Sequence, residues 1–341
     1  MGILADGLSR RGHQVTLYAP QGSRTKAKLI DLGSGPFDYV DRSEADINRV
    51  VASKLRYLTA LFRRADEYDV IHLHTEPYYL GAPFLTGVDT PVIITNHNRF
   101  IDEDRRLLKL FPKLNVVTIS KRQAALRPPG TRSVRTVYNG LDVSKYRFGP
   151  SNSGRFLFLG RVSEEKGITQ AIEAARQAGI GLDIAGPCTP SLFESQIKPL
   201  LSKNIRYLGV IKGTKLRHLL RNARAALLPT NWEEPFGMVF IEAMASGTPV
   251  ISFAQGAAPE VIKDGETGYL VNRSRHDKRG AWEVKQTSTA GIVSAILKVC
   301  SLPPEEYLIM RHASRRRVEK HFTVERMLDG YEAAYEKITK R

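Results

Sequence analysis

Cysteine is scarce in this sequence, and long apolar runs are missing from it. Only Cys188 and Cys300 occur among the 341 residues, which excludes a disulfide framework and a cysteine-rich metal site. No apolar stretch reaches the roughly 20 residues that a membrane-spanning helix needs, and no secretory leader pattern precedes the first helix-like segment. These absences predict a cytoplasmic protein whose contact with a membrane, where it occurs, is peripheral and on the inner face.

Acidic residues are also in the minority, because 51 Lys and Arg face 35 Asp and Glu and leave a net charge of +16. Such a chain attracts anionic ligands, anionic membrane surfaces and nucleic acids. The basic clusters at residues 127–135, 273–279 and 315–317 carry no helix-turn-helix, RNP or zinc-finger pattern, so we expect no nucleic-acid partner. An acceptor bound at a membrane makes better use of the charge.

The length of the chain suggests about two domains. Apolar strand-like segments alternate with helix-like segments throughout, which predicts parallel βαβ units, an α/β fold and doubly wound sheets. Strands are expected at residues 14–19, 68–74, 90–95, 114–119 and 134–138, and then, beyond a connection at 141–154, at 155–159, 182–185, 205–208, 225–228, 250–252 and 268–271. Helices are expected at residues 1–11, 45–65, 166–178, 214–222 and 324–340.

The most informative stretch is residues 231–250, Asn-Trp-Glu-Glu-Pro-Phe-Gly-Met-Val-Phe-Ile-Glu-Ala-Met-Ala-Ser-Gly-Thr-Pro-Val. It follows a strand-like run and contains a helix that is expected to open near Gly237 and to close at Gly247. The free N–H groups of Gly237, Met238 and Val239 would form a phosphate site at the start of this helix.

Two carboxylates flank that helix start, Glu234 before it and Glu242 about two turns further on. A carboxylate repels phosphate but accepts hydrogen bonds from vicinal hydroxyl groups. N–H groups that bind phosphate, flanked by two carboxylates that accept hydrogen bonds from diols, indicate a nucleotide-sugar site. Glu242 is expected to bind the ribose and Glu234 the transferred hexose. Either glutamate taken alone is more often an ordinary solvated residue.

Residues 160–167, Gly-Arg-Val-Ser-Glu-Glu-Lys-Gly, lie at a strand-to-helix turn. At this turn, the planar guanidinium of Arg161 and the compact charge of the Lys166 ammonium can both bind one diphosphate. Cations whose attraction grows as the departing diphosphate gains charge lower the barrier to transfer. The alternative is that both are surface cations beside Glu164 and Glu165.

Three histidines and one acidic string are less specific. His97 follows an apolar strand, where α/β sheets present side chains to a cleft, although a half-buried packing role is the common alternative. His72 and His74 share one face of a strand, and without a third ligand at matching spacing we interpret them as packing residues. Residues 102–104, Asp-Glu-Asp, predict the acidic first turn of a helix rather than a metal site.

Together, residues 231–250 resemble at every position the Glu-x7-Glu signature of retaining family 4 glycosyltransferases of the GT-B fold (glycosyl transferases group 1 type). The resemblance covers nearly the whole chain, but the family's first strand and glycine-rich loop are expected to be lacking. It implies two Rossmann-like, doubly wound parallel-sheet domains facing a cleft. The domain that binds the acceptor is expected at residues 1–143, and the domain that binds the nucleotide-sugar at 152–322. Residues 323–341 are expected to form a helix that crosses back to the first domain.

The resemblance also implies a reaction and a site. A hexose passes from a nucleoside diphosphate to an acceptor hydroxyl with retention of configuration and without a metal ion, by same-face attack or by double displacement. His97, Glu234, Arg161 and Lys166 are assigned to catalysis, His97 through a hydrogen bond to the donor sugar. The expected donor contacts are Arg161, Lys166, Glu234, Phe236, Gly237, Met238, Val239, Glu242, Gly186 and Val210.

The nucleobase, the acceptor and the type of activity each allow alternatives. The base is expected against the loops after residues 185 and 208, with UDP preferred to GDP or ADP, and no cofactor is expected. The acceptor can be a small molecule, a glycan or a lipid-linked molecule. The alternatives are a sugar-nucleotide epimerase or a phosphorylase on the same fold, and a donor-binding protein that has lost catalysis because its first strand is missing.

Overall fold

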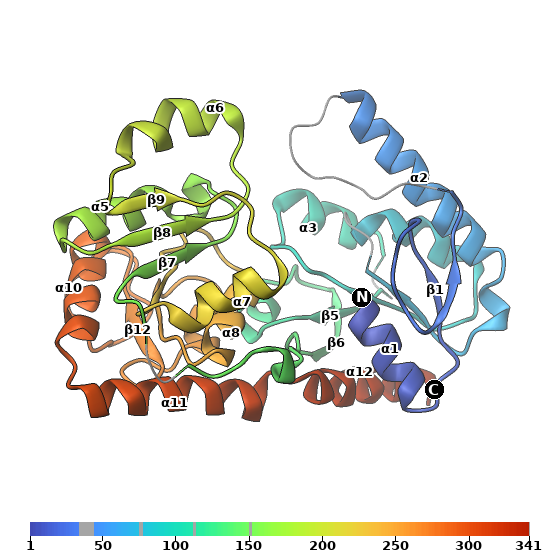
Figure 1. The fold of residues 1–341 in the computed structure, drawn as a ribbon. Coiled ribbons are helices and arrows are strands. Elements are labelled where there is room, and N and C mark those ends of the chain that lie inside the picture. Colours follow the sequence, from blue (N-terminus) through green and yellow to red (C-terminus); the bar gives the residue numbers. More distant parts are fainter. Residues whose placement is uncertain (34–43, 75–77, 112–113, 150–151, 341) are drawn as a thin grey trace. The chain divides into compact units, whose positions relative to one another are not determined.

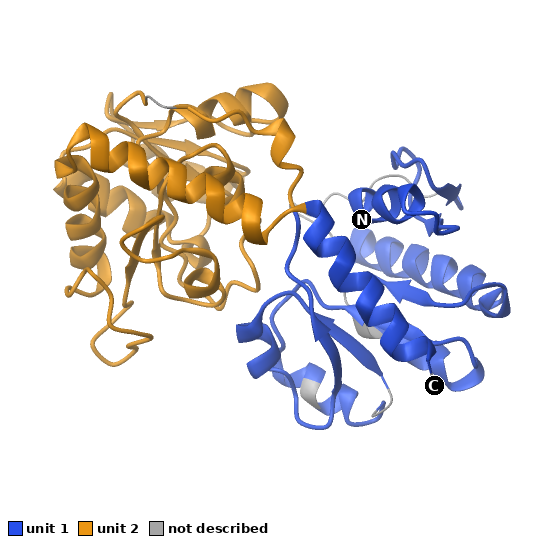
Figure 2. Cartoon of the chain, turned by 90° about the horizontal axis from the view of Figure 1, so that it is seen from below, with its two compact units in different colours: residues 1–140, 324–341 blue, residues 141–323 orange. Residues whose placement is uncertain are grey.

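The computed structural model describes residues 1–33, 44–74, 78–111, 114–149 and 152–340 (Figure 1). The chain divides into two compact units, Met1–Gly140 with Val324–Arg341, and Leu141–Thr323 (Figure 2). Each unit has parallel strands with helices between them, as the alternation in the sequence predicts. Within the described residues, no helix is long and apolar enough to cross a membrane.

In the second unit, the strands of the described residues form a six-stranded sheet in the order β12-β11-β10-β7-β8-β9. Every recorded pairing in it is parallel. The first strand lies in the middle and the order reverses beside it, which is the Rossmann arrangement, and ligands bind outside the carboxyl ends of the strands at such a reversal. The strands are β7 (Phe156–Leu159), β8 (Leu182–Ala185), β9 (Ile205–Tyr207), β10 (Ala226–Leu227), β11 (Val250–Phe253) and β12 (Gly268–Val271).

Helices cover this sheet, and their apolar residues recur at helical spacing. In α5 (Ile168–Gln177), for example, Ile168, Ala171, Ile172 and Ala175 are buried, which places one face of the helix on the core. The other helices are α6 (Pro190–Leu192), α7 (Gly213–Asn222), α8 (Met238–Ala245), α9 (Ala258–Val261), α10 (Ser288–Ser301) and α11 (Pro304–His321). β7, β8, β11 and β12 are buried at every position, as expected for parallel strands with both faces covered.

The described residues of the first unit form two separate sheets. One has the order β3-β4-β5-β6 and the other is the pair β1-β2. The strands are β1 (Thr16–Tyr18), β2 (Lys28–Ile30), β3 (Ile71–Leu73), β4 (Val92–Thr95), β5 (Asn115–Thr118) and β6 (Arg132–Thr136), and the helices are α1 (Gly2–Arg10), α2 (Glu44–Phe62), α3 (Asp102–Leu108), α4 (Lys121–Ala125) and α12 (Val324–Thr339). The predicted acidic first turn is confirmed, because α3 begins at Asp102 and the Asp104 carboxylate accepts the Ile101 N–H at 2.8 Å.

The carboxyl-terminal helix α12 is part of the core of this unit. Its buried residues Leu328 and Tyr331 pack in one cluster with Leu4 and Leu8 of α1. A Cβ on Gly7 would lie 2.7 Å from the Leu328 side chain, so the absence of a side chain at Gly7 lets the two helices approach closely. The end of the chain therefore holds its beginning in place.

Candidate functional site

The predicted donor-binding residues of the second unit follow the carboxyl ends of four strands. Arg161 and Lys166 follow β7, Gly186 follows β8, Val210 follows β9 and Glu234 follows β10. These four strands are neighbours in the parallel sheet, so their loops lie at one edge of it. This is the edge at which Rossmann-like sheets bind ligands.

Lys166 and Glu234, which were predicted to hold different parts of a donor, form an ion pair. The Lys166 ammonium donates to Oε2 of Glu234, and the indole Nε1 of Trp232 donates to the same oxygen at 2.9 Å. Lys166 Nζ also lies 4.7 Å from the centre of the Trp232 ring. Glu234 is only 9% exposed, and these two donors offset the loss of water around its carboxylate.

The sequence interpretation missed Trp232. The available signal was its position two residues before Glu234, because an indole is a hydrogen-bond donor without an acceptor and therefore suits a neighbouring carboxylate. Its ring and its N–H hold the ion pair from one side.

Backbone contacts fix the position of Glu234. Gly256 has a φ of +56°, and a Cβ there would lie 2.2 Å from both N and O of Glu234. The Ala257 N–H donates to the Glu234 carbonyl at 2.9 Å, and the Asn231 N–H donates to the Glu165 carbonyl at 2.8 Å. The loop that carries Glu234 is therefore joined both to the loop after β11 and to the loop that carries Lys166.

Arg161 has a different partner from Lys166. Its guanidinium contacts the Glu165 carboxylate at 3.3 Å, and both side chains are at least half exposed. The two cations thus pair with two different carboxylates, Arg161 with Glu165 and Lys166 with Glu234. An exposed pair of this kind contributes little stability, so an anionic ligand can replace Glu165 at small cost.

The helix that begins after these loops is α8, with Gly237 at its N-cap in a left-handed conformation. A Cβ on Gly237 would meet the Phe240 ring at 2.4 Å. Phe236 is buried, with its ring edge-on to Phe322 at 5.8 Å, so its side chain belongs to the core and only its backbone remains for a ligand. Met238 is exposed and Val239 half-buried in the first turn, whose N–H groups have no partner within an α-helix.

Glu242 lies one turn further along α8, and the Tyr146 hydroxyl donates to its Oε1 at 3.3 Å. Burial raises the pKa of Glu242, and the bond from Tyr146 opposes this rise. A carboxylate that has lost water in this way is stabilised by further hydroxyl donors. No local pattern indicated Tyr146, because this residue lies in the segment that was interpreted only as a connection.

The loops after β7, β8 and β9 pack directly on one another. Gly186 donates its N–H to the Gly209 carbonyl at 2.9 Å, and a Cβ on Gly186, at a φ of +148°, would lie 1.8 Å from the Gly160 carbonyl oxygen. Val210 follows with a side chain that is 54% exposed. A ligand at these loops would meet mainly backbone groups.

His97 belongs to the first unit, where it follows β4. Its Nε2 shares a hydrogen bond of 2.9 Å with Nδ1 of His74. His72 bonds Thr95 Oγ1 through Nε2 and the Tyr335 hydroxyl through Nδ1, both at 2.7 Å. His74, predicted to be a packing residue, is thus the partner of His97; the signal for this was that both follow neighbouring strands.

Burial lowers the pKa of His97 to about 4 and that of His72 to about 3, and holds the pKa of His74 well below its usual range. All three imidazoles are therefore neutral near pH 7 and act as hydrogen-bonding groups rather than as charges. Among the residues that the structure describes, no group of three or more His, Cys, Asp and Glu side chains is arranged to hold a metal ion.

The strand order and the loop chemistry define a class of protein with two Rossmann-like units, one of which presents cations, carboxylates and a helix N-terminus at its ligand-binding edge. Comparison with known families extends this. Residues 147–288 match the family model described as glycosyl transferases group 1, and residues 3–145 match the model described as Glycosyltransferase Family 4. The chain belongs to the family 4 glycosyltransferases, and the predicted resemblance and GT-B fold are confirmed.

Two relatives and two solved structures illustrate the match. Glycogen synthase of Mycobacterium tuberculosis is 33% identical over 151 residues, which are 41% of this chain and only 36% of that protein. Phosphatidyl-myo-inositol mannosyltransferase of the same organism is 26% identical over 365 residues, covering 96% of this chain and 90% of that protein. Sucrose-phosphate synthase from Thermosynechococcus elongatus superposes with a TM-score of 0.75 at 19% identity, covering 99% and 92%. Anabaena Alr3699/HepE, solved with UDP and glucose, gives 0.67 at 18% identity, covering 90% and 85%.

Proposed function

We propose that this protein transfers a hexose from a UDP-sugar to an acceptor hydroxyl, with retention of configuration and without a metal ion. The observation that carries the proposal is the Lys166–Glu234 ion pair under the Trp232 indole, beside the loops at the carboxyl edge of the sheet. The family supports sugar transfer in general. The structure of Alr3699/HepE with UDP and glucose supports UDP as the nucleotide.

The diphosphate is assigned to Arg161, Lys166 and the first turn of α8. Arg161 exchanges an exposed carboxylate for the phosphate, which costs about 0–1 kcal/mol. Lys166 shares its ammonium between Glu234 and the phosphate. Since negative charge grows on the diphosphate as the glycosidic bond breaks, these cations bind the transition state more tightly than the donor and so lower the barrier.

The two glutamates are assigned to hydroxyl groups. Glu242 accepts from the ribose diol, a role that fits a half-buried carboxylate whose pKa is raised by burial and to which Tyr146 donates. Glu234 accepts from the hexose, and Lys166 and Trp232 hold its carboxylate in a fixed orientation. Sugar recognition and leaving-group stabilisation are thereby coupled through one ion pair.

His97 is assigned to the donor sugar. Its Nε2 is already bonded to His74, so Nδ1 is the nitrogen that remains for a sugar hydroxyl. A pKa of about 4 keeps the ring neutral, which suits hydrogen bonding near a carbon that develops positive charge. Retention is assigned to same-face attack, in which the acceptor enters beside the departing phosphate and the phosphate oxygen takes its proton.

The test is a thermal-shift panel of UDP-, GDP- and ADP-sugars, each with and without EDTA, followed by product analysis. We expect UDP-sugars to raise the melting temperature and EDTA to change nothing. A strict requirement for a divalent cation would contradict the metal-free reaction. The anomeric configuration of the product, measured by NMR, tests retention.

Two controls separate the alternatives. A new sugar made from the donor alone would identify an epimerase. Stabilisation by UDP-sugar without turnover, across small-molecule, glycan and lipid-linked acceptor pools, would identify a donor-binding protein without catalysis. One relative is named a phosphatidyl-myo-inositol mannosyltransferase, and this chain has a net charge of +16. Lipid-linked acceptors at an anionic membrane surface are therefore the first pool to test.

A further inference from the structure

The loop that follows β12, residues 272–280, contains three arginines and one lysine, and the proposed reaction uses none of them. Asn272 joins the start of this loop to its end. Oδ1 of this buried residue accepts the Arg279 N–H at 2.8 Å and the Trp282 indole N–H at 3.0 Å, and Nδ2 donates to the Gly280 carbonyl at 2.9 Å. These contacts fix the shape of residues 272–280, which we call the basic loop.

Two arginines of the basic loop bind the loop 231–234, which carries the glutamate assigned to the hexose. Arg273 donates from Nη1 to the Asn231 carbonyl at 2.9 Å. Arg279 donates from Nη2 to Oε1 of Glu233 at 2.9 Å, and both of these side chains are 26% exposed. The basic loop therefore holds the loop 231–234 at its first and its third residue.

The guanidinium of Arg279 also reaches the loop after β11. It donates to Oε1 of Gln255 at 3.3 Å through Nη2 and to Oδ1 of Asp277 at 2.6 Å through Nε. The buried Gln255 donates in turn to Oδ2 of Asp277 at 2.6 Å. Partial burial raises the pKa of Asp277, but the hydrogen bonds from Arg279 and Gln255 outweigh this effect and leave the pKa below its usual value. Arg279 is thus the centre of a network that contains two carboxylates, Glu233 and Asp277.

Through this network, Arg279 joins two loops that meet at Glu234. Glu233 directly precedes Glu234 in the chain. Gln255 directly precedes Gly256, and a Cβ on Gly256 would lie 2.2 Å from the Glu234 backbone, so the two loops touch there. A carboxylate that accepts hydrogen bonds from a sugar has to keep its position, because a displacement of about 1 Å can cost about 100-fold in rate.

We infer that Arg279 is a positioning residue for Glu234. It holds Glu233 and Gln255 in place, so that the Glu234 carboxylate keeps the orientation in which it accepts hydrogen bonds from the hexose. This inference rests on the proposed function, because it takes Glu234 as the residue that binds the sugar. Arg279 acts through the two loops and not through contact with the donor.

The competing explanation is that the basic loop binds an external anion directly. Arg275 and Lys278 are exposed, and no side-chain partner is recorded for either among the described residues, so an anion-binding loop would depend on them at least as much as on Arg279. In contrast, the carboxylates of Glu233 and Asp277 offset the charge of Arg279 and reduce its attraction for an anion. The contacts of Arg279 therefore favour a positioning role.

The first test replaces Arg279 by glutamine and by lysine. Glutamine removes the charge, whereas lysine keeps a cation that can still pair with Glu233 or Asp277. We expect Arg279→Gln to lower kcat and the affinity for the UDP-sugar by at least about tenfold each, and to change the affinity for UDP by less than about twofold. Arg279→Lys should recover part of the loss. The matched control is Arg275→Gln, and an equal effect of this control would overturn the inference in favour of an anion-binding loop.

Glu233→Gln tests the route by which Arg279 acts. If Arg279 positions Glu234 through Glu233, the variants Glu233→Gln and Arg279→Gln should lose the same sugar-dependent affinity. The double variant should then be no more than about twofold worse than Arg279→Gln alone. Additive losses would show that the two side chains act independently, and the inference would be wrong.

A second measurement needs neither turnover nor a donor. The chain has two tryptophans, Trp232 and Trp282, and incorporation of fluorotryptophan gives each a 19F resonance, which Trp282→Phe assigns. Since Trp232 lies in the loop that carries Glu234, we expect Arg279→Gln to shift or broaden its resonance and Arg275→Gln to leave it unchanged. An unchanged Trp232 resonance in Arg279→Gln would refute the positioning role. The proposed function fails separately if the unmodified protein binds no UDP-sugar, and the Trp232 resonance then still shows whether Arg279 fixes the loop.

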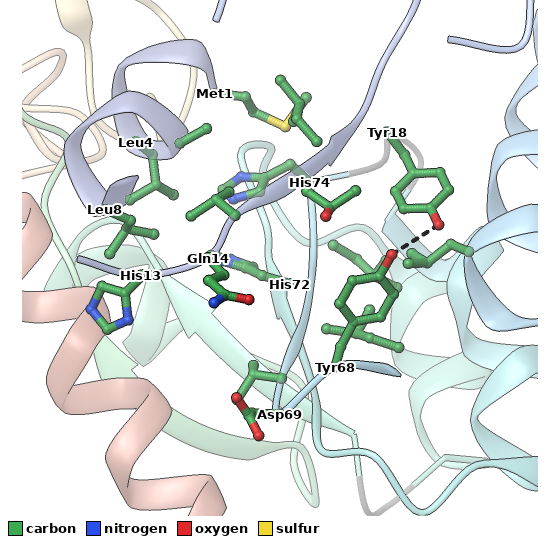
Figure 3. A pocket seen from close by; sticks show the side chains of 18 of the residues that line it. Met1, Leu4, Leu8, His13, Gln14, Tyr18, Tyr68, Asp69, His72 and His74 are labelled. Carbon is green, nitrogen blue, oxygen red and sulfur yellow. Dashed lines mark hydrogen bonds between the residues drawn. The ribbon is translucent and has the colours of Figure 1, made fainter. Parts of the chain in front are cut away.

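A final control separates positioning from general stability. Tyr68→Phe removes the 3.1 Å hydrogen bond between the hydroxyl groups of Tyr18 and Tyr68 in the first unit (Figure 3). Urea denaturation compares the stability of this variant with that of Arg279→Gln, and circular dichroism confirms that both are folded in the assay. We expect Tyr68→Phe to leave the affinity for the UDP-sugar and the Trp232 resonance unchanged. If it reduces this affinity as much as Arg279→Gln does, the loss reflects stability alone and Arg279 is not a positioning residue.

Discussion

Replacing Lys166 by methionine tests the centre of the proposed site. The change keeps the unbranched apolar stem of the side chain and removes its charged end. Among the described residues, the Glu234 carboxylate then loses its cation and retains the Trp232 N–H as its side-chain donor. Removing one partner of a fully buried ion pair costs about 3–5 kcal/mol. The Lys166 side chain is 23% exposed and that of Glu234 11%, and water there reduces the expected loss to about 2–3 kcal/mol.

Urea denaturation measures this loss. In a unit of this size, about 2–3 kcal/mol lowers the melting temperature by roughly 4–12 °C. The matched control is Lys198→Met, since the Lys198–Glu194 pair is about 60% exposed on both sides and should contribute less than about 1 kcal/mol. If both variants lose the same stability, the Lys166–Glu234 pair is not a special feature of the site.

A double-mutant cycle with Glu234→Gln isolates the interaction. We expect a coupling energy of about 1–3 kcal/mol. Kinetic measurements provide an independent test. Removal of a cation that acts on the departing diphosphate should lower kcat more than it raises KM. A coupling energy near zero together with a pure KM effect would refute the assignment of Lys166 to the leaving group.

The remaining predictions concern the glutamates, one glycine and the histidines. Glu242→Ala should weaken binding of UDP and UDP-sugar equally, whereas Glu234→Ala should remove only the additional affinity for the UDP-sugar. Calorimetry with both ligands checks this. An equal loss of UDP affinity in both variants would contradict the division of roles. Gly256→Ala forces a Cβ to within 2.2 Å of the Glu234 backbone at a positive φ, so we expect at least about 2 kcal/mol of destabilisation by urea titration. The control is Gly87→Ala, which has open space around the added Cβ and should change the stability by less than about 1 kcal/mol. The pKa of His97 is lowered to about 4 in the folded protein, so between pH 6.5 and 4 the unfolded chain binds this proton more readily than the folded chain does. The stability that comes from the neutral His97 is therefore fully present above pH 6.5 and is lost as the pH decreases towards 4. His97→Asn should flatten this slope in denaturation curves measured from pH 7 to 4, and an unchanged slope would show that His97 does not contribute to it.

The sequence predicted the second unit in more detail than the first, for a physical reason. Its strands are buried on both faces, and such strands appear in a sequence as continuous apolar runs. The runs at 155–159, 182–185 and 250–252 each coincide with a strand. In contrast, β2 is exposed or half-buried and has neither an apolar run nor a clear alternation, so no strand was expected there.

The site shows the same division between what a sequence carries and what folding adds. The glutamates and cations could be named as candidate site residues from the sequence, because their chemistry depends on residue type and local spacing. Tyr146 lies 96 positions from Glu242, and Arg161 selects Glu165 rather than sharing a partner with Lys166. Such pairings depend on how the loops fold together, and nothing local in the sequence specifies them.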